Sequence, residues 1–178
     1  GQVFRSFGVM RRVFDAARAA KRRVVFAEGE DERVLRTAQA MREDIGVTPI
    51  LIGRPEVVDN RIEREGLKLV RGKDFDLVNP ENDPRYRDYW QSYHSLMRRR
   101  GVTPDLAKMV LRSNTTAIAA VMVHRGEADS MICGTFGEYR WHLNYVSQVL
   151  ADNAHHAVAA LSLIILESGP MFIGDTQV

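Results

Sequence analysis

Two loops in the sequence have residue types that could hold an anionic ligand. One is Ala27–Glu32, with the sequence AEGEDE, and the other is Gly134–Glu138, with the sequence GTFGE. Each follows a short apolar run typical of a buried strand and precedes a segment with helical periodicity. Such loops lie at the edge of a parallel sheet where ligands bind, and the free N–H groups at a helix start can hold a phosphate or a carboxylate.

The two loops differ in charge, and therefore in how well each could hold an anion. Four of the six residues in Ala27–Glu32 are acidic, so they would repel a phosphate, and helix capping with compensation of the helix dipole is the favoured interpretation. In the second loop, Gly134 and Gly137 let the backbone approach a ligand closely, with Thr135 between them. The second loop is the credible anion site, although a purely structural turn explains its pattern equally well.

A run of three arginines closes a later helical segment. Arg98, Arg99 and Arg100 precede Gly101, a position where cations offset the negative end of the helix dipole. Adjacent guanidinium groups also suit phosphate ligands, because each offers a planar fork of donors. A solvated helix end is the favoured interpretation, and contact with phosphate is the alternative.

The other reactive side chains do not form a recognisable catalytic centre. The five histidines have no metal-ligand spacing with carboxylates or with the cysteine, so we expect no metal in this chain. Cys133 ends an apolar run beside a glycine, which suits a small buried residue better than a nucleophile. No serine with a nearby base is visible, and we expect no catalytic residue.

Composition limits the class of protein. The chain has 178 residues, is 45% hydrophobic and has a formal charge of +2, which fits one α/β domain or one domain with part of another, and indicates neither a nucleic-acid nor a membrane partner. The single cysteine excludes an internal disulfide and indicates a reducing compartment, so we expect a cytoplasmic location. The sequence has no apolar run of about 18 residues and no secretory signal.

Strand and helix patterns alternate along the chain, which predicts a mostly parallel sheet covered on both faces. In the long helix, Asp83 is expected to cap the first turn, Pro84 fits that turn, and the aromatic stripe from Tyr86 to Tyr93 is expected to pack against the core. Polar residues near 151–155 suggest a crossing between domains. The expected strands are 23–27, 48–53, 129–133, 159–166 and 171–174, and the expected helices are 31–44, 54–62, 83–97 and a further one from 104.

Five segments together resemble the phosphotransacetylase-like C-terminal domain of large bacterial NADP-dependent malic enzymes, from the phosphate acetyl/butyryl transferase family. This resemblance implies a three-layer αβα fold like that of isocitrate and isopropylmalate dehydrogenases, with a first domain at 1–150 and the truncated start of an incomplete second domain at 151–178. It also implies that malate-binding and NADP-binding domains precede Gly1 and that the second domain continues after Val178. The segments are VVFAEGEDERVLRTAQ, TPILIGRPE, ENDPRYRDYWQSYHSLMRRRGVTP, GEADSMICGTFGEYRWHL and FIGDTQV.

Two departures from active phosphotransacetylases bear on function. Those enzymes have arginines where this sequence has Met97 and Asn144, and a loop of the His-Ser-Thr type where it has Gly137-Glu-Tyr. Losing two guanidinium groups would remove stabilisation of the charged transition state. The resemblance therefore implies a non-catalytic module that senses acetyl-CoA or a related acyl-CoA and assembles a homo-oligomer.

The resemblance also assigns candidate residues and cofactors. Gly134, Thr135 and Gly137 are expected to contact the ligand through their backbone, with the arginine run and Arg140 as weaker phosphate contacts. No cofactor is expected in this part of the enzyme, whereas NADP and Mg or Mn would belong to the malic-enzyme domains. An active phosphate acyltransferase and a purely structural assembly domain are the alternatives.

Overall fold

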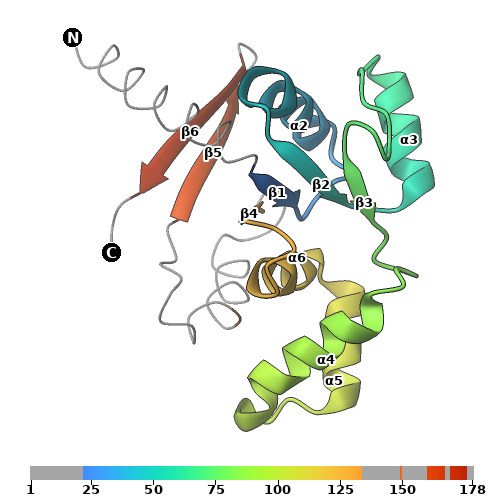
Figure 1. The fold of residues 1–178 in the computed structure, drawn as a ribbon, viewed down its shortest axis with the longest axis vertical. Coiled ribbons are helices and arrows are strands. Elements are labelled where there is room, and N and C mark those ends of the chain that lie inside the picture. Colours follow the sequence, from blue (N-terminus) through green and yellow to red (C-terminus); the bar gives the residue numbers. More distant parts are fainter. Residues whose placement is uncertain (1–21, 134–148, 150–159, 167–168, 176–178) are drawn as a thin grey trace.

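The computed structural model describes residues 22–133, 149, 160–166 and 169–175, and its centre is a parallel sheet of four strands (Figure 1). The strand order is β3-β2-β1-β4, and every neighbouring pair is parallel. Val25 of β1 pairs with Ile50 of β2 on one side and with Met131 of β4 on the other. The strands are β1 Arg23–Phe26, β2 Thr48–Ile52, β3 Asp76–Val78 and β4 Ser130–Ile132.

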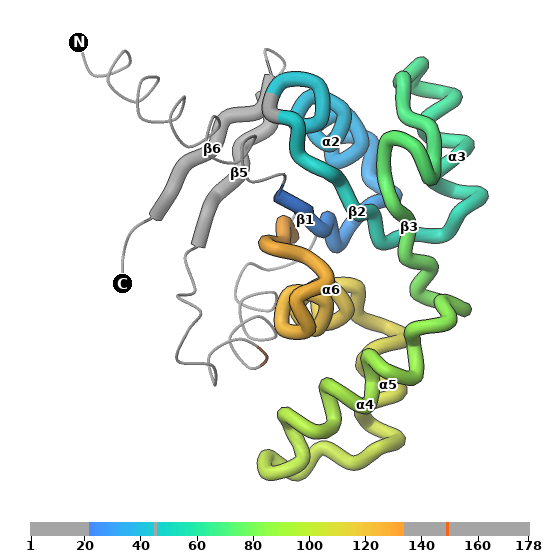
Figure 2. The backbone as a smooth tube through the Cα atoms, in the orientation of Figure 1, coloured from blue at the N-terminus to red at the C-terminus, as the bar shows by residue number. Residues whose placement is uncertain are grey.

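One face of the sheet is covered by α2 Glu32–Ile45 and α3 Pro55–Arg64. Alternate strand residues point to this face, where Phe26 and Leu51 pack with Leu35 in one buried cluster. Asp31 caps α2 by accepting the backbone N–H groups of Arg33 and Val34, as the acidic loop predicted. Figure 2 shows the two helices on the same side of β1 and β2.

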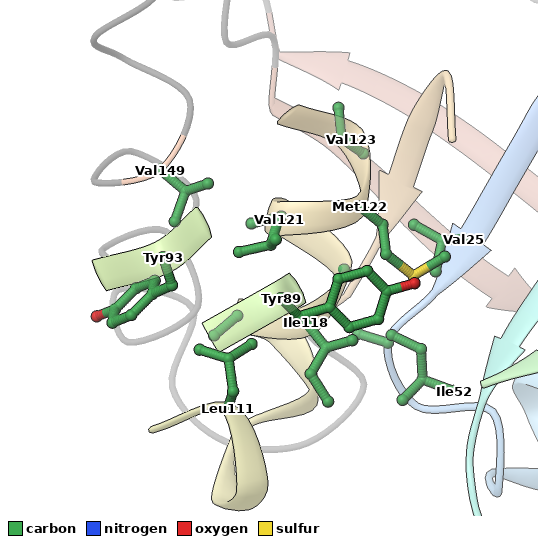
Figure 3. Packing of buried hydrophobic residues seen from close by; sticks show 14 of the residues in the cluster. Val25, Ile52, Tyr89, Tyr93, Leu111, Ile118, Val121, Met122, Val123 and Val149 are labelled. Carbon is green, nitrogen blue, oxygen red and sulfur yellow. The ribbon is translucent and has the colours of Figure 1, made fainter. Parts of the chain in front are cut away.

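The opposite face is covered by α4, α5 and α6. The intervening strand residues, including Val25 and Ile52, pack there against Tyr89 and Met122 (Figure 3). Thr116 to Val123 of α6 are all buried, so this helix lies between the sheet and the other two. The three-layer α/β prediction is confirmed. The helices are α4 Tyr86–Met97, α5 Pro104–Ser113 and α6 Thr115–His124, with a 3-10 turn, η1 Arg98–Arg100, after α4.

The predicted start of the long helix was wrong. The helix α4 begins at Tyr86, with Arg85 as its N-cap residue and no side-chain cap. The Asp83 carboxylate instead accepts the backbone N–H of Arg85 at 2.9 Å and pairs with its guanidinium at 3.0 Å. These local bonds stabilise a turn at Pro84 and Arg85 in place of a first helical turn.

Two further strands form a separate antiparallel hairpin. β5 Ala160–Leu166 pairs with β6 Gly169–Asp175, with Leu163 opposite Phe172. Both strands were predicted, whereas their antiparallel pairing was not. The expected domain crossing near 151–155 lies outside the described residues, so the two-domain division stays a prediction.

Within the described ranges, no single helix has the length and apolar character to cross a membrane. The neighbouring helices α5 and α6 reach that length and composition only as a pair, bent by 109° between them.

Candidate functional site

The carboxyl ends of β1 and β2 open onto a cavity of about 280 Å³, here called the edge cavity. It lies between the loop after β1, the end of β2, helix α3, the segment after β3 and the first residue of α6. Ligands in open parallel sheets bind at this edge. The lining residues are Ala27, Glu28, Glu30, Asp31, Ile52, Gly53, Arg61, Pro80 and Thr115.

Two glycines allow the first loop to pack against β2. The N–H of Gly29 donates to the Ile52 carbonyl at 3.0 Å, and a Cβ at Gly29 would lie 2.8 Å from that oxygen. A Cβ at Gly53 would lie 2.9 Å from Cγ of Glu30. A Cβ at Gly29 would press on backbone, and one at Gly53 would displace a side chain, so the loop after β1 and the end of β2 are tightly packed.

Glu30 is held by two arginines. Its carboxylate accepts Nε of Arg54 at 2.8 Å and Nη2 at 3.0 Å, and it also accepts the Arg54 backbone N–H. Arg61 donates from Nη1 to the Glu30 carbonyl at 2.9 Å. The hydrogen bond from Arg54 lowers the pKa of Glu30 despite the opposing effect of burial.

Asp31 is the second compensated carboxylate. Arg33 donates to it from Nε at 3.2 Å and from Nη2 at 3.1 Å, in addition to the two backbone N–H groups of the cap. Burial raises the pKa of Asp31, but the bonds from Arg33 and the backbone outweigh it, so the net shift is downward. The sequence predicted the cap, whereas it did not show that arginines neutralise both acids.

Cys133 follows β4 at the same edge of the sheet. The side chain is partly buried, and this burial, together with the nearby charge of Glu28, raises the pKa of the thiol to about 11. A thiol with that pKa stays protonated at neutral pH and is a poor nucleophile. The interpretation of Cys133 as a packing residue is therefore supported.

Four of the seven predicted ligand residues fall in a segment that the structure does not describe. Gly134, Thr135, Gly137, Arg140 and also Asn144 lie outside the described residues. Their roles stay predictions.

The arginine run is described, and it forms the exposed turn η1 between α4 and α5. Gly101 ends this turn with φ of 85°, which favours glycine. Figure 1 places the turn at the end of the α4–α5 pair, and none of Arg98, Arg99 and Arg100 lines the edge cavity. Their position at a helix end fits the favoured interpretation from sequence.

Met97 lies in the core. Its side chain is 3% exposed and belongs to the buried cluster that includes Tyr93 and Val149, which Figure 3 shows near each other. The position at which active phosphotransacetylases are expected to have an arginine is thus filled here by an apolar thioether within a packed interior.

Arg61 and Thr115 are lining residues that sequence reasoning missed. Arg61 lies in the middle of a helical pattern and reaches the cavity only through the packing of α3. Asn114 offered a signal for Thr115, because Asn before an apolar run is typical of an N-cap, and its side chain does accept the N–H of Ala117.

Metal ligands are not grouped within the described part of the chain. No cluster of three or more His, Cys, Asp or Glu side chains there could hold a metal ion. The described residues do not fit the divalent metal of a malic enzyme.

Comparison with known proteins identifies relatives along the full chain. The NAD-dependent malic enzyme of Rhizobium meliloti (strain 1021) is 51% identical over 178 residues, covering 99% of this chain and 23% of that protein. The NADP-dependent malic enzyme of Escherichia coli (strain K12) is 45% identical over 177 residues, with the same two coverages. The chain therefore spans about a quarter of the length of these relatives.

The fold has solved counterparts. A phosphotransacetylase from Streptococcus pyogenes matches with a TM-score of 0.70 at 22% sequence identity, over 85% of this chain and 46% of that one. The family model described as Phosphate acetyl/butaryl transferase matches residues 8–178. Because that match covers nearly every residue, the chain belongs to the phosphate acetyl/butaryl transferase family.

Proposed function

We propose that this protein is a phosphotransacetylase-like module of a malic enzyme, which binds acetyl-CoA or a related acyl-CoA without transferring the acetyl group. The single observation that supports it best is the burial of Met97 in the core. An acyl-phosphate site needs fixed positive charge where negative charge develops, and a thioether offers none. Without acetyl transfer, the proposed role of the family fold in this protein is to bind the acyl-CoA and to regulate the enzyme.

The whole enzyme is proposed to oxidise and decarboxylate malate to pyruvate and CO₂ in the cytoplasm. That reaction, with NADP and Mg or Mn, would take place in domains outside this chain. One relative is named NAD-dependent and another NADP-dependent. Assays of malate oxidation with NAD and with NADP would decide which cofactor the whole enzyme uses.

The deciding experiment measures malate-dependent reduction of NADP by the full-length protein while acetyl-CoA is titrated, beside an assay for acetyl phosphate. We expect the rate of malate turnover to change with acetyl-CoA and no acetyl phosphate to form. Acetyl phosphate above background would contradict a non-catalytic module and support an active acyltransferase, the second candidate.

An assembly role is part of the proposal, since the resemblance implies a homo-oligomer through this domain. The aromatic face of α4 is a poor interface, because Tyr89 and Tyr93 are buried in the domain's own core. Deleting the module and measuring the solution mass tests assembly separately from regulation. A smaller oligomer with unchanged response to acetyl-CoA would indicate a purely structural domain.

A further inference from the structure

Helix α5 has exposed apolar residues on the side that faces away from the core. Ala107 and Leu111 are fully buried on its inner side. One turn apart on its outer side, Leu106 is 38% exposed and Met109 is 59% exposed. Among the described residues, Val70 is the one other large apolar side chain that is exposed. Figure 2 shows the α4–α5 pair projecting away from the four-stranded sheet. Since a surface helix ordinarily has a single apolar face, the outer face of α5 is available for a further contact.

Opposite charges lie near the two ends of this outer face. Asp105 lies in the first turn of α5 and Arg112 in the last turn. The two residues are two turns apart, so both lie on the same side of the helix, with Met109 between them. The Asp105 side chain is 95% exposed, and its contact with Lys108 at 3.6 Å is a surface pair of the kind that contributes little. Arg112 donates from Nε to the Tyr86 hydroxyl, and its guanidinium has further N–H donors that can bind a carboxylate.

The outer face of α5 is complementary to a second copy of itself. When two copies of the helix pack antiparallel about a two-fold axis at Met109, each Asp105 lies beside the partner's Arg112. On the other flank of the helix, Leu106 lies beside the partner's Val110, which is partly buried in its own domain. Parallel packing would instead bring like charges together, which is unfavourable. The charge pattern therefore favours antiparallel pairing of α5 with its copy.

We propose that α5 forms a two-fold contact between two copies of this domain, centred on Met109. This inference rests on the assembly role in the proposed function and assigns a surface to it. Stable interfaces bury about 1,600 Å² in total, which is more than one pair of ten-residue helices covers. The α5 contact is therefore one part of the interfaces in the full-length oligomer, and it determines which faces of two neighbouring domains meet.

Cysteine cross-linking in the full-length protein tests the two-fold geometry. Met109→Cys, oxidised with diamide, is expected to give about fivefold more disulfide-linked dimer than Val70→Cys, because the axis brings position 109 within disulfide reach of its copy. Val70 is the matched control, since it is 56% exposed and lies outside α5. Equal yields of linked dimer from the two variants would overturn the contact.

Charge reversal tests the pairing across the axis. Asp105→Arg and Arg112→Asp are each expected to weaken association of the full-length protein about tenfold, since each creates two pairs of like charges across the axis. An equal mixture of the two variants is expected to restore association, because every pair in the mixed contact then joins an arginine to an aspartate. Sedimentation over a series of dilutions measures the dissociation. An effect of either change on folding would not be reversed by mixing, so a mixture that dissociates as readily as each variant alone overturns the proposal.

Failure of the α5 contact is distinguishable from failure of the proposed function. If deletion of the whole module makes the oligomer smaller while the α5 variants have no effect, assembly through this domain stands and the α5 contact is overturned. Met109→Asp is expected to weaken association. If it lowers only the melting temperature and leaves the dissociation unchanged, α5 packs against another domain of the same polypeptide, and the second copy is overturned as the partner. The response of malate turnover to acetyl-CoA is measured separately in each variant.

Discussion

Gly29 lies where the first loop packs against β2, and no side chain fits there. A Cβ would come within 2.8 Å of the Ile52 carbonyl oxygen and 2.9 Å of the Leu51 Cβ. Neither is the flexible end of a side chain, so the loop itself would have to move. The geometry of this single residue therefore fixes the distance between the loop and the strand beside the edge cavity.

We predict that Gly29→Ala lowers the free energy of unfolding by about 2–3 kcal/mol, in the range for overpacking. Gly66→Ala is the control, since Gly66 has φ of 63° but nothing within 4 Å of an added Cβ. Gly66→Ala is expected to lower the free energy of unfolding by about 1 kcal/mol, through backbone strain alone. Urea denaturation of both variants measures the difference, and equal losses would show that the loop relaxes without cost.

The pair of Glu30 and Arg54 predicts a pH dependence of stability. The pKa of Glu30 is lowered in the folded protein from its ordinary value of 4.5. A lowered pKa means that the pair's stabilisation is fully present above pH 4.5 and is lost as the pH falls through the folded-state value. Acid should therefore weaken the attachment of this loop to the start of α3.

We expect Arg54→Gln to reduce the loss of stability between neutral and acid pH, because the glutamate then loses its charged partner. Urea unfolding at neutral pH and at a pH well below 4.5 gives the two values for each protein. Arg71→Gln is the control, since its partner Asp59 is exposed and such pairs contribute little. An acid dependence that is unchanged in Arg54→Gln would assign the effect to other carboxylates.

At the scale of elements, the spacing of apolar residues predicted the positions of the strands that depend on local sequence alone. The strands at 23–27, 48–53 and 129–133 were found within one residue at either end, because continuous apolar runs are typical of strands buried on both faces. The strand β3 was missed, since its three residues, Asp76 to Val78, are too few to show a period. The antiparallel pairing of β5 and β6 depends on long-range register, which apolar runs do not specify.

The site was less predictable than the fold. The capping role of the acidic loop and the packing role of Cys133 were predicted, because both depend on neighbours in the chain, although the prediction did not say that Asp31 is the capping residue. It did not show the contact between Arg61 and Glu30, which are 31 residues apart. Nor could it place Thr115 beside the loop after β1, since the order of strands and the position of α6 decide that proximity.

The joint between α4 and α5 shows two tyrosine hydroxyls in opposite environments. Tyr86 donates to the Lys108 carbonyl at 2.6 Å and accepts Nε of Arg112 at 3.0 Å. The hydroxyl of Tyr89 is buried and makes no well-formed hydrogen bond to the described residues, and burial, with a smaller effect from the nearby Glu127 carboxylate, raises its pKa. Cζ of Arg85 and Cζ of Arg125 each lie 5.7 Å from the centroid of its ring. Only the first hydroxyl links the two helices.

We predict that Tyr86→Phe destabilises the protein by about 1 kcal/mol, because it removes a well-formed hydrogen bond. Tyr89→Phe is expected to be neutral or stabilising, because it removes the desolvation cost of a buried hydroxyl that makes no well-formed hydrogen bond. Both changes delete one oxygen from the same helix, so each is the control for the other. The free energy of unfolding in urea distinguishes them. A similar loss in both variants would mean that the Tyr89 hydroxyl does donate to a partner, for which the Glu127 carboxylate is the candidate.

At the scale of the whole molecule, Met97 is part of the domain's core and also occupies the position where an active transferase is expected to have an arginine. We predict that Met97→Arg in the full-length protein produces no acetyl phosphate and lowers the melting temperature, because a guanidinium in this packed cluster would be buried without a partner charge. Ser95→Arg, at an exposed position of the same helix, is the control and should leave the melting temperature unchanged. The measurements are thermal unfolding and the acetyl phosphate assay. A folded Met97→Arg variant that forms acetyl phosphate would show that one side chain separates this module from a transferase, and that the loss at Asn144 is not disabling.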